Sequence, residues 1–195
     1  MLEPARREAT YEDLFTIPEN MTGEIIDGEL IVTPRPSPKH SRASSILGHK
    51  IGPYQAGEEG GPGGWIILDE VEIKLAEECR PIVPDLSGWR VERFPKIIDT
   101  NWISVPPDWV CEVLSPRTAR LDRIKKMSKY AKFEVRHIWL IDPILMTLEV
   151  FKLESGRWVL LGAFEENDKV RAEPFQEVEI DLGSLWLEEP SRPTD

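Results

Sequence analysis

The sequence has few of the residues that form disulfides or hold transition metals. Its 195 residues include two cysteines, Cys79 and Cys111, and three histidines. This small supply argues against a zinc site built from cysteine and histidine, and two cysteines fit a reduced, intracellular protein. No apolar run approaches the roughly 18 residues of a membrane span, and no apolar stretch follows the charged residues 1–10. We therefore expect a soluble, cytoplasmic protein with no signal peptide and no membrane segment.

Positive charge is also in short supply. The chain has 24 basic and 35 acidic residues, which gives a formal net charge of −11. This balance argues against a protein that coats nucleic acid nonspecifically, because phosphate contacts need a basic surface. It does not exclude a nuclease, since a bound cation neutralises clustered acids and the local field matters more than the total charge.

The glycine-rich stretch 57–64 lacks the chemistry of a phosphate-binding loop. No Gly-Lys-Ser/Thr follows it and no helical pattern begins there, so we interpret it as a flexible loop. A length of 195 residues with 41% hydrophobic residues is enough for a real core. We find no internal repeat and no long linker, and we expect one domain over residues 1–195.

Apolar periodicity predicts a mixture of strands and helices. The pair Asp27-Gly28 suits a tight type I′ turn inside a hairpin over residues 24–32. Further strands are predicted at 65–75, 81–91, 109–114, 137–141, 147–152, 157–164, 169–172 and 178–180. Helices are predicted at 10–18, at 118–133 and over a segment that begins at Ser37 or His40 and ends at Gln55. Residues 77–80 are predicted to form a turn, residues 95–107 an irregular insertion, and residues 182–187 the closing edge of the sheet.

The helix over residues 118–133 has an apolar and a polar side. At about 100° per residue, one arc carries Leu121, Ile124, Met127 and Ala131, and we expect it to pack inward. The opposite side carries Asp122, Lys126, Lys129, Tyr130 and Phe133.

Two acids lie next to apolar residues in predicted strands. Asp85 follows Pro84, and an unpartnered carboxylate there would be costly to bury, so Asp85 is a metal ligand, a paired acid or the cap of a turn. Glu112 lies inside the apolar strand 109–114, and glutamate is rarely buried without a partner. That partner is either an arginine, with Arg117 or Arg120 as candidates, or a hard cation.

Lys126 is the candidate cation beside these acids. A lysine on a helix is usually a solvated charge, but Lys126 lies one turn after Asp122 and one turn before Tyr130. The helix also follows the Glu112 strand directly, so this side can lie beside the strand end. Lys125 and Lys129 remain alternatives on periodicity alone.

Several segments together resemble the Uma-two family, a bacterial branch of the PD-(D/E)XK restriction-endonuclease-like superfamily. The resemblance rests on the hairpin 24–30, the pair Pro84-Asp85, the segment 111–116, the run 122–130 and the strand 139–143. It covers roughly residues 10–182. The motifs are weak individually, but their order and spacing are specific. One departure is His137-Ile138-Trp139, where the family commonly has Glu-Tyr-Trp.

The resemblance implies an α/β (α+β) fold with a restriction-endonuclease-like core, in which helices flank a mixed central sheet. To this core the chain adds the N-terminal hairpin and C-terminal strands. The resemblance further implies that Asp85, Glu112 and the backbone carbonyl of Val113 hold a metal ion, and that Glu24 is an additional acid at the site edge. The superfamily lysine is missing two residues after the second acid, where Leu114 stands. In the Uma-two branch the lysine comes from the following helix, and Lys126 matches it.

The chemistry expected from these residues is Mg²⁺-dependent hydrolysis of phosphodiester bonds in nucleic acid, DNA in particular, with Mn²⁺ able to substitute for Mg²⁺. The resemblance also suggests a homodimer, and Trp102, Trp109 and the insertion 95–107 are candidate interface residues. His40 is left outside the core set, because a lone histidine is more often structural.

Three other interpretations remain open. The first is a nuclease-like fold that has lost activity and acts as a binding or regulatory module. The second is glycoside hydrolysis by paired carboxylates, which leaves Lys126 unexplained. The third is a structural module whose buried acids form ion pairs.

Overall fold

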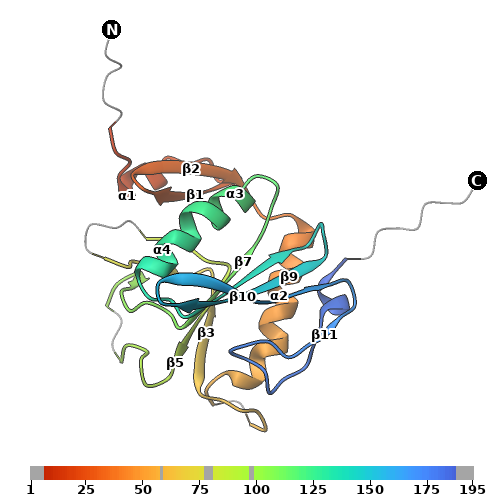
Figure 1. The fold of residues 1–195 in the computed structure, drawn as a ribbon. Helices are drawn as coiled ribbons and strands as arrows, with labels where there is room; N and C mark the ends of the chain where they lie inside the picture. Colours follow the sequence, from red (N-terminus) through yellow and green to blue (C-terminus); the bar gives the residue numbers. More distant parts are fainter. Residues whose placement is uncertain (1–6, 58, 77–80, 97–98, 188–195) are drawn as a thin grey trace, which may run out of the picture.

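A six-stranded mixed sheet lies at the centre of the computed structural model, which describes residues 7–57, 59–76, 81–96 and 99–187. Figure 1 shows helices and a separate hairpin around this sheet. The strands are ordered β10-β9-β8-β7-β5-β3. Their bounds are β3 Trp65–Asp69, β5 Leu86–Arg90, β7 Trp109–Val113, β8 His137–Asp142, β9 Thr147–Glu154 and β10 Arg157–Glu165. The predicted turn at residues 77–80, with Cys79, lies outside the described residues.

The two central strands β7 and β8 are parallel. Trp109 pairs with His137 and Val113 with Ile141, whereas the other strand pairs in this sheet are antiparallel. A parallel pair needs a crossover connection, and the helical segment between the two strands supplies it. The predicted adjacency of residues 110–114 and 138–141 is confirmed.

Each face of the sheet has its own apolar core, because successive residues of a strand point to opposite faces. On one face Trp109, Cys111 and Val113 of β7 pack with the long helix α2 (Pro38–Ile51) and with Phe175. On the other face Val110 packs with residues of the crossover helix and of the N-terminal hairpin. Glu112, between Cys111 and Val113, points toward this second face, which is where the polar cluster described below lies.

The crossover helix is continuous but contains a π-helical turn. Its parts are α3 (Ala119–Leu121), the π-turn η2 (Asp122–Lys126) and α4 (Met127–Lys132). The backbone N–H of Met127 donates to the carbonyl of Asp122, which is the five-residue spacing of a π-turn. Such turns widen the helix locally and often occur at functional sites.

The expected orientation of this helix is wrong in one respect. Ile124 was assigned to the inward arc, but it is 61% exposed. The buried residues are instead Asp122, Lys126 and Tyr130, on the side expected to be polar. The reason is that these side chains are paired with other buried polar groups, so the helix buries a polar cluster in its centre, while Leu121 and Met127 are only partly buried at its sides.

The N-terminal hairpin forms its own two-stranded sheet and packs into the core on the second face of the central sheet, beside this helix. It consists of β1 (Met21–Ile26) and β2 (Glu29–Pro34), preceded by the short helix α1 (Tyr11–Leu14). Asp27 and Gly28 both have positive φ angles, as the predicted type I′ turn requires. Figure 1 shows the hairpin near the α3 end of this helix, and ion pairs join the hairpin residues Glu24, Asp27 and Glu29 to the helix.

The C-terminal part packs against α2. It contains the two-stranded pair β11 (Lys169–Val170) and β12 (Ile180–Asp181) and the 3₁₀ helix η3 (Leu182–Leu185). Residues 182–187 were expected to close the sheet edge, but η3 makes no strand pairing, and Leu182 and Leu185 are buried in the α2 core. Arg42 of α2 donates to the carbonyl of Trp186, which fixes this segment.

The remaining elements are small. A 3₁₀ turn, η1 (Gly52–Tyr54), ends α2, and β4 (Glu72–Ile73) pairs in parallel with β6 (Trp102–Ile103) inside the predicted irregular insertion. Trp109, an expected interface residue, is completely buried and packs edge-on against Trp139. It therefore cannot form an interface.

Candidate active site

A buried ion pair joins the central strand to the crossover helix. Glu112 of β7 and Lys126 of η2 are 2% and 3% exposed, and Lys126 Nζ lies 3.1 Å from Glu112 Oε2. The sequence left an arginine or a cation as the partner of Glu112, and in the structure the partner is this lysine. Burying two charges costs more than their attraction returns unless further hydrogen bonds satisfy them.

Lys126 is surrounded by three carboxylates. Besides Glu112, its ammonium lies 3.0 Å from Glu24 Oε2 of β1 and 3.5 Å from Asp122 Oδ1. Three carboxylates around one ammonium leave this cluster with two formal negative charges in excess. Asp122 Oδ1 makes no hydrogen bond within the described part of the chain. The cluster is therefore short of positive charge and of donors.

Tyr130 completes the shell around Glu112. Its hydroxyl donates to Glu112 Oε1 at 2.5 Å, so both oxygens of this buried carboxylate have a partner. Burial raises the pKa of Glu112 well above its usual range, and the nearby Asp122, Asp85 and Glu24 raise it further, while Lys126 opposes them. Burial alone would lower the pKa of Lys126, but the three acids hold it well above normal, so Lys126 stays an ammonium.

Asp85 lies beside this cluster and binds different partners. Its Oδ2 accepts the backbone N–H of Val113 at 2.7 Å, and its Oδ1 lies 3.1 Å from Nε2 of His40 in α2. Asp85 follows Pro84 and immediately precedes Leu86, the first residue of β5. Burial would lower the pKa of His40, but Asp85, Glu70 and the backbone of Val113 together raise it.

Glu24 connects the hairpin to the segment that carries Asp85. Its Oε1 accepts the backbone N–H of Val83 at 3.0 Å, while its Oε2 contacts Lys126. One carboxylate thereby ties β1, the strand entry and the crossover helix together.

The cluster opens into a groove of about 610 Å³. Its lining includes the site residues Glu24, His40, Asp85, Val113, Asp122 and Lys126. Arg35 and Arg117 line the same groove. Glu112 itself is not part of the lining, and its two oxygens accept from Lys126 and Tyr130.

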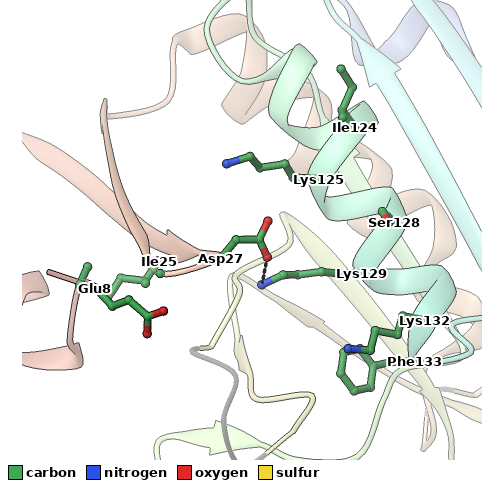
Figure 2. A pocket seen from close by; sticks show the side chains of 11 residues that line it. Glu8, Ile25, Asp27, Ile124, Lys125, Ser128, Lys129, Lys132 and Phe133 are labelled. Atoms are coloured by element: carbon green, nitrogen blue, oxygen red, sulfur yellow. Dashed lines mark ion pairs between the residues drawn. The ribbon is translucent and has the colours of Figure 1, made fainter. Parts of the chain in front are cut away.

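The two competing lysines face a different hollow. Figure 2 shows Lys125 and Lys129 reaching from the crossover helix toward the tip of the hairpin. Lys129 pairs with Asp27 at 3.2 Å and Lys125 with Glu29 at 3.2 Å. Both line a hollow of about 550 Å³ that does not include Asp85, Glu112 or Lys126. Of the three candidate lysines, Lys126 alone lies among the acids.

The oxygen atoms of the site carry enough negative charge for a hard divalent cation. Their side chains do not surround one common point where such an ion would lie. Within the described residues, no three histidine, cysteine, aspartate or glutamate side chains converge as a ligand set. The oxygens of Asp85 and Glu112 are taken by protein donors. The excess negative charge and the carboxylate and carbonyl oxygens nevertheless match what Mg²⁺ or Mn²⁺ binds.

Sequence reasoning placed Glu24, Glu112 and Lys126 in the site, and the structure brings these three together. It places Asp85 beside them, in contact with His40. His40 and Asp122 were not in the expected set, although His40 contacts Asp85 and Asp122 contacts Lys126. A signal for Asp122 exists in its spacing of four residues from Lys126, whereas nothing in the local pattern distinguishes His40 from a structural histidine.

The mixed sheet, the crossover helix on its central strands and the acids at the strand ends define a restriction-endonuclease-like fold. A model of the Uma2 family, described as "Putative restriction endonuclease", matches residues 9–183. The chain therefore belongs to the Uma2 family. Membership supports nuclease function in general, that is, a hydrolase acting on nucleic acid.

A solved structure agrees with this assignment. The crystal structure of a "putative nuclease belonging to DUF820" from Anabaena variabilis has a TM-score of 0.69 and 24% sequence identity to this chain, and the match covers 91% of this chain and 97% of that one. This similarity shows the same fold. No curated protein matches the chain. In the described ranges, no helix is both long and apolar enough to cross a membrane.

Proposed function

We propose that the protein is a metal-dependent endonuclease that hydrolyses phosphodiester bonds in nucleic acid, with DNA as the substrate class. The observation that carries the proposal is the burial of Lys126 among Glu24, Glu112 and Asp122 at the wall of a groove that also contains Asp85. An ammonium held at a groove wall by excess carboxylates is costly to maintain for stability alone. It is suited to a site that must handle a cation and a phosphate together.

Asp85, Glu112 and the carbonyl of Val113 are the groups that would hold Mg²⁺, or Mn²⁺ in its place. When bound, the ion supplies a water of lowered pKa and a counter-charge for the phosphoryl group. Lys126 faces the groove and provides the second positive charge, which stabilises the charge that develops on the phosphoryl oxygens. Glu24 keeps Lys126 in position through the 3.0 Å contact and is placed to orient a water in the groove.

The groove offers contacts for the substrate backbone. Arg35 and Arg117 line it together with the site acids, and arginine is the residue best suited to phosphate oxygens. We include a homodimer in the proposal, as the family resemblance implies. Light scattering should then give twice the mass of one chain.

The metal site is tested by Asp85→Asn. The variant keeps an oxygen that accepts the Val113 N–H but loses the charge, so Mn²⁺ affinity measured by calorimetry should fall strongly while circular dichroism stays unchanged. Asp181→Asn, which changes a carboxylate in the distant C-terminal segment, is the matched control. Parent-like Mn²⁺ binding by Asp85→Asn would show that the site is assigned to the wrong residues.

The catalytic role of Lys126 is tested by Lys126→Ala, with Lys125→Ala and Lys129→Ala as controls. Loss of one positioned charge typically lowers the rate by roughly 10²–10³, and the two controls should retain parent activity because their lysines pair with the hairpin tip. Cleavage is measured on labelled single- and double-stranded DNA with Mg²⁺ or Mn²⁺.

Lys126→Ala also removes the only ammonium from among three carboxylates, and breaking a buried pair costs about 3–5 kcal/mol of stability. Lys126→Arg keeps the charge and should stay folded, yet it should cut slowly because a planar guanidinium places its charge differently. Parent activity in Lys126→Arg and Lys126→Ala would refute the role of Lys126. A folded parent that binds Mn²⁺ but cuts no substrate would replace the nuclease proposal with the binding-module interpretation.

A further inference from the structure

His40 has no part in the reaction described above, although it lies in the same groove. It begins the first turn of α2, where its backbone N–H donates to the N-cap side chain of Ser37 at 3.3 Å. This cap fixes the start of the helix and so the direction of the imidazole. The side chain is 13% exposed, and its Nε2 is directed at Asp85 Oδ1, 3.1 Å away.

The imidazole contacts the same groups that are assigned to the metal ion. Asp85 is one of these groups, and Val113 is connected to it, because the Val113 backbone N–H donates to the same carboxylate and the Val113 backbone raises the pKa of His40. A cation held by Asp85 and the Val113 carbonyl must therefore either displace the imidazole or accept it as a ligand. The N-cap at Ser37 and the packing of Ala43 and Leu47 in the core hold α2 in place, so a large displacement of His40 is opposed.

The other ring nitrogen points to the same conclusion. Nδ1 of His40 is buried and makes no hydrogen bond within the described residues, although buried polar atoms are normally satisfied. A histidine kept only as a counter-charge for Asp85 would be expected to use both nitrogens. Glu70 lines the same groove, and its charge acts on this imidazole.

We infer that His40 is a direct ligand of the metal ion, which places one imidazole nitrogen beside the oxygens of Asp85 and Val113. This inference rests on the proposed metal site and goes beyond it, because a nitrogen donor changes which ions the site prefers. Imidazole binds Mn²⁺ and Co²⁺ better than it binds Mg²⁺, which favours all-oxygen shells. The site should therefore select Mn²⁺ or Co²⁺ over Mg²⁺.

The selectivity is tested by titrating the parent and His40→Ala with Mn²⁺ and Mg²⁺ in a calorimeter, without nucleic acid. We expect His40→Ala to lose about tenfold or more in Mn²⁺ affinity but much less in Mg²⁺ affinity, so the Mn²⁺/Mg²⁺ ratio falls. His49→Ala on the exposed side of the same helix is the matched control and should leave both affinities unchanged. An equal loss for both ions would mean that His40 acts through charge or packing and would overturn the inference.

Coordination itself is read by pulsed electron paramagnetic resonance of bound Mn²⁺ in protein labelled with ¹⁵N-histidine. The parent should show a coupling to a directly bound ¹⁵N nucleus, and His40→Gln, which can still hydrogen-bond to Asp85, should not. Mn²⁺ that binds, is lost in Asp85→Asn and shows no nitrogen coupling would overturn the role of His40 and leave the proposed metal site intact. Absence of any Mn²⁺ binding to the parent would overturn both.

Discussion

At the scale of single residues, the site is under electrostatic stress when no cation is bound. Glu112 and Asp122 are both almost fully buried, and burial and neighbouring acids raise the pKa of each. Lys126 offsets only part of the repulsion. A carboxyl whose folded-state pKa is raised binds a proton more tightly in the folded than in the unfolded chain, so its contribution to stability is present at low pH and is lost as the pH rises through the folded-state pKa.

Glu112→Gln should therefore stabilise the metal-free protein at neutral pH. The amide oxygen still accepts from Lys126, the NH2 group can donate to the Tyr130 oxygen, and the side chain carries no charge, while Lys126 keeps Glu24 and Asp122 as partners. The expected gain in the free energy of unfolding is on the order of 1 kcal/mol where Glu112 of the parent is ionised, and it shrinks as the pH falls and this carboxyl takes up its proton.

Urea unfolding of both proteins in chelator, at a series of pH values, measures this difference. Tyr130 and Lys126 stay protonated throughout the range because their pKa values are raised, so they do not add to the slope. A difference that is independent of pH would contradict the assignment of the stress to Glu112. The same variant should bind Mn²⁺ more weakly, which separates the effect on stability from the effect on the site.

At the scale of elements, the central strand β5 positions Asp85, which immediately precedes it. Gly88 in β5 lies between two buried indole rings. A Cβ at Gly88 would be 3.2 Å from Trp109 Cε3 and 3.3 Å from Trp65 Cε3. Both rings are completely or almost completely buried and belong to neighbouring strands, so neither can move away easily. The close approach of three strands therefore requires glycine here.

Gly88→Ala should destabilise the protein by about 1–3 kcal/mol, the usual cost of an extra methyl in a packed core. Because β5 shifts to relieve the contact, Asp85 moves with it and Mn²⁺ affinity should fall as well. Gly52→Ala is the control, since a Cβ there meets no heavy atom within 4 Å, and its backbone is helical with φ −48°. Thermal unfolding that is unchanged in Gly88→Ala would show that the rings can repack.

Some of the helices, strands and turns could be predicted from the sequence, and others could not. The hairpin turn at Asp27-Gly28 and the parallel pair of strands around Glu112 were predictable, because turn chemistry and apolar runs are local signals. The inward side of the crossover helix was not, because periodicity assigns the apolar arc to the core. Here the polar side is buried through pairs with Glu24 and Glu112, which are distant in sequence, and a π-turn alters the spacing.

The contact of His40 with Asp85 belongs to the same group of unpredictable features. It joins α2 to the start of β5 across the fold, and no periodicity within either segment indicates it. For the same reason the sequence could name Lys125, Lys126 and Lys129 as candidates but could not choose by contact. The structure distinguishes them. Lys126 contacts the site acids Glu24, Glu112 and Asp122, whereas Lys125 and Lys129 pair with acids of the hairpin tip.

At the scale of the whole molecule, the charge of −11 must be reconciled with a nucleic-acid substrate. Part of the negative charge is paired, since Lys125, Lys129 and Arg123 form ion pairs with acids of other elements. The groove itself contains both the acidic cluster and two arginines. Binding to DNA should therefore be weak, depend on a divalent cation and involve few phosphate contacts, with a shallow dependence on salt.

Arg117→Ala should weaken DNA binding by the Asp85→Asn protein, in which cleavage is blocked, and should reduce the slope of log affinity against log salt by about 1, the value for one lost phosphate contact. Arg117 lies just beyond Val113, at the end of β7 that carries the site. Arg157 is the matched control, because it lies at the opposite end of the sheet. It is the first residue of β10 and is paired with Glu154 of β9. Glu154 follows Lys152, which is paired with His137, the first residue of β8. Arg157→Ala should leave both affinity and slope unchanged.

Fluorescence anisotropy with a short labelled duplex between about 25 and 200 mM salt gives both values. Equal effects of the two arginines would mean that DNA senses only the overall charge and does not lie in the groove, whereas no effect of either would remove the groove from the substrate path.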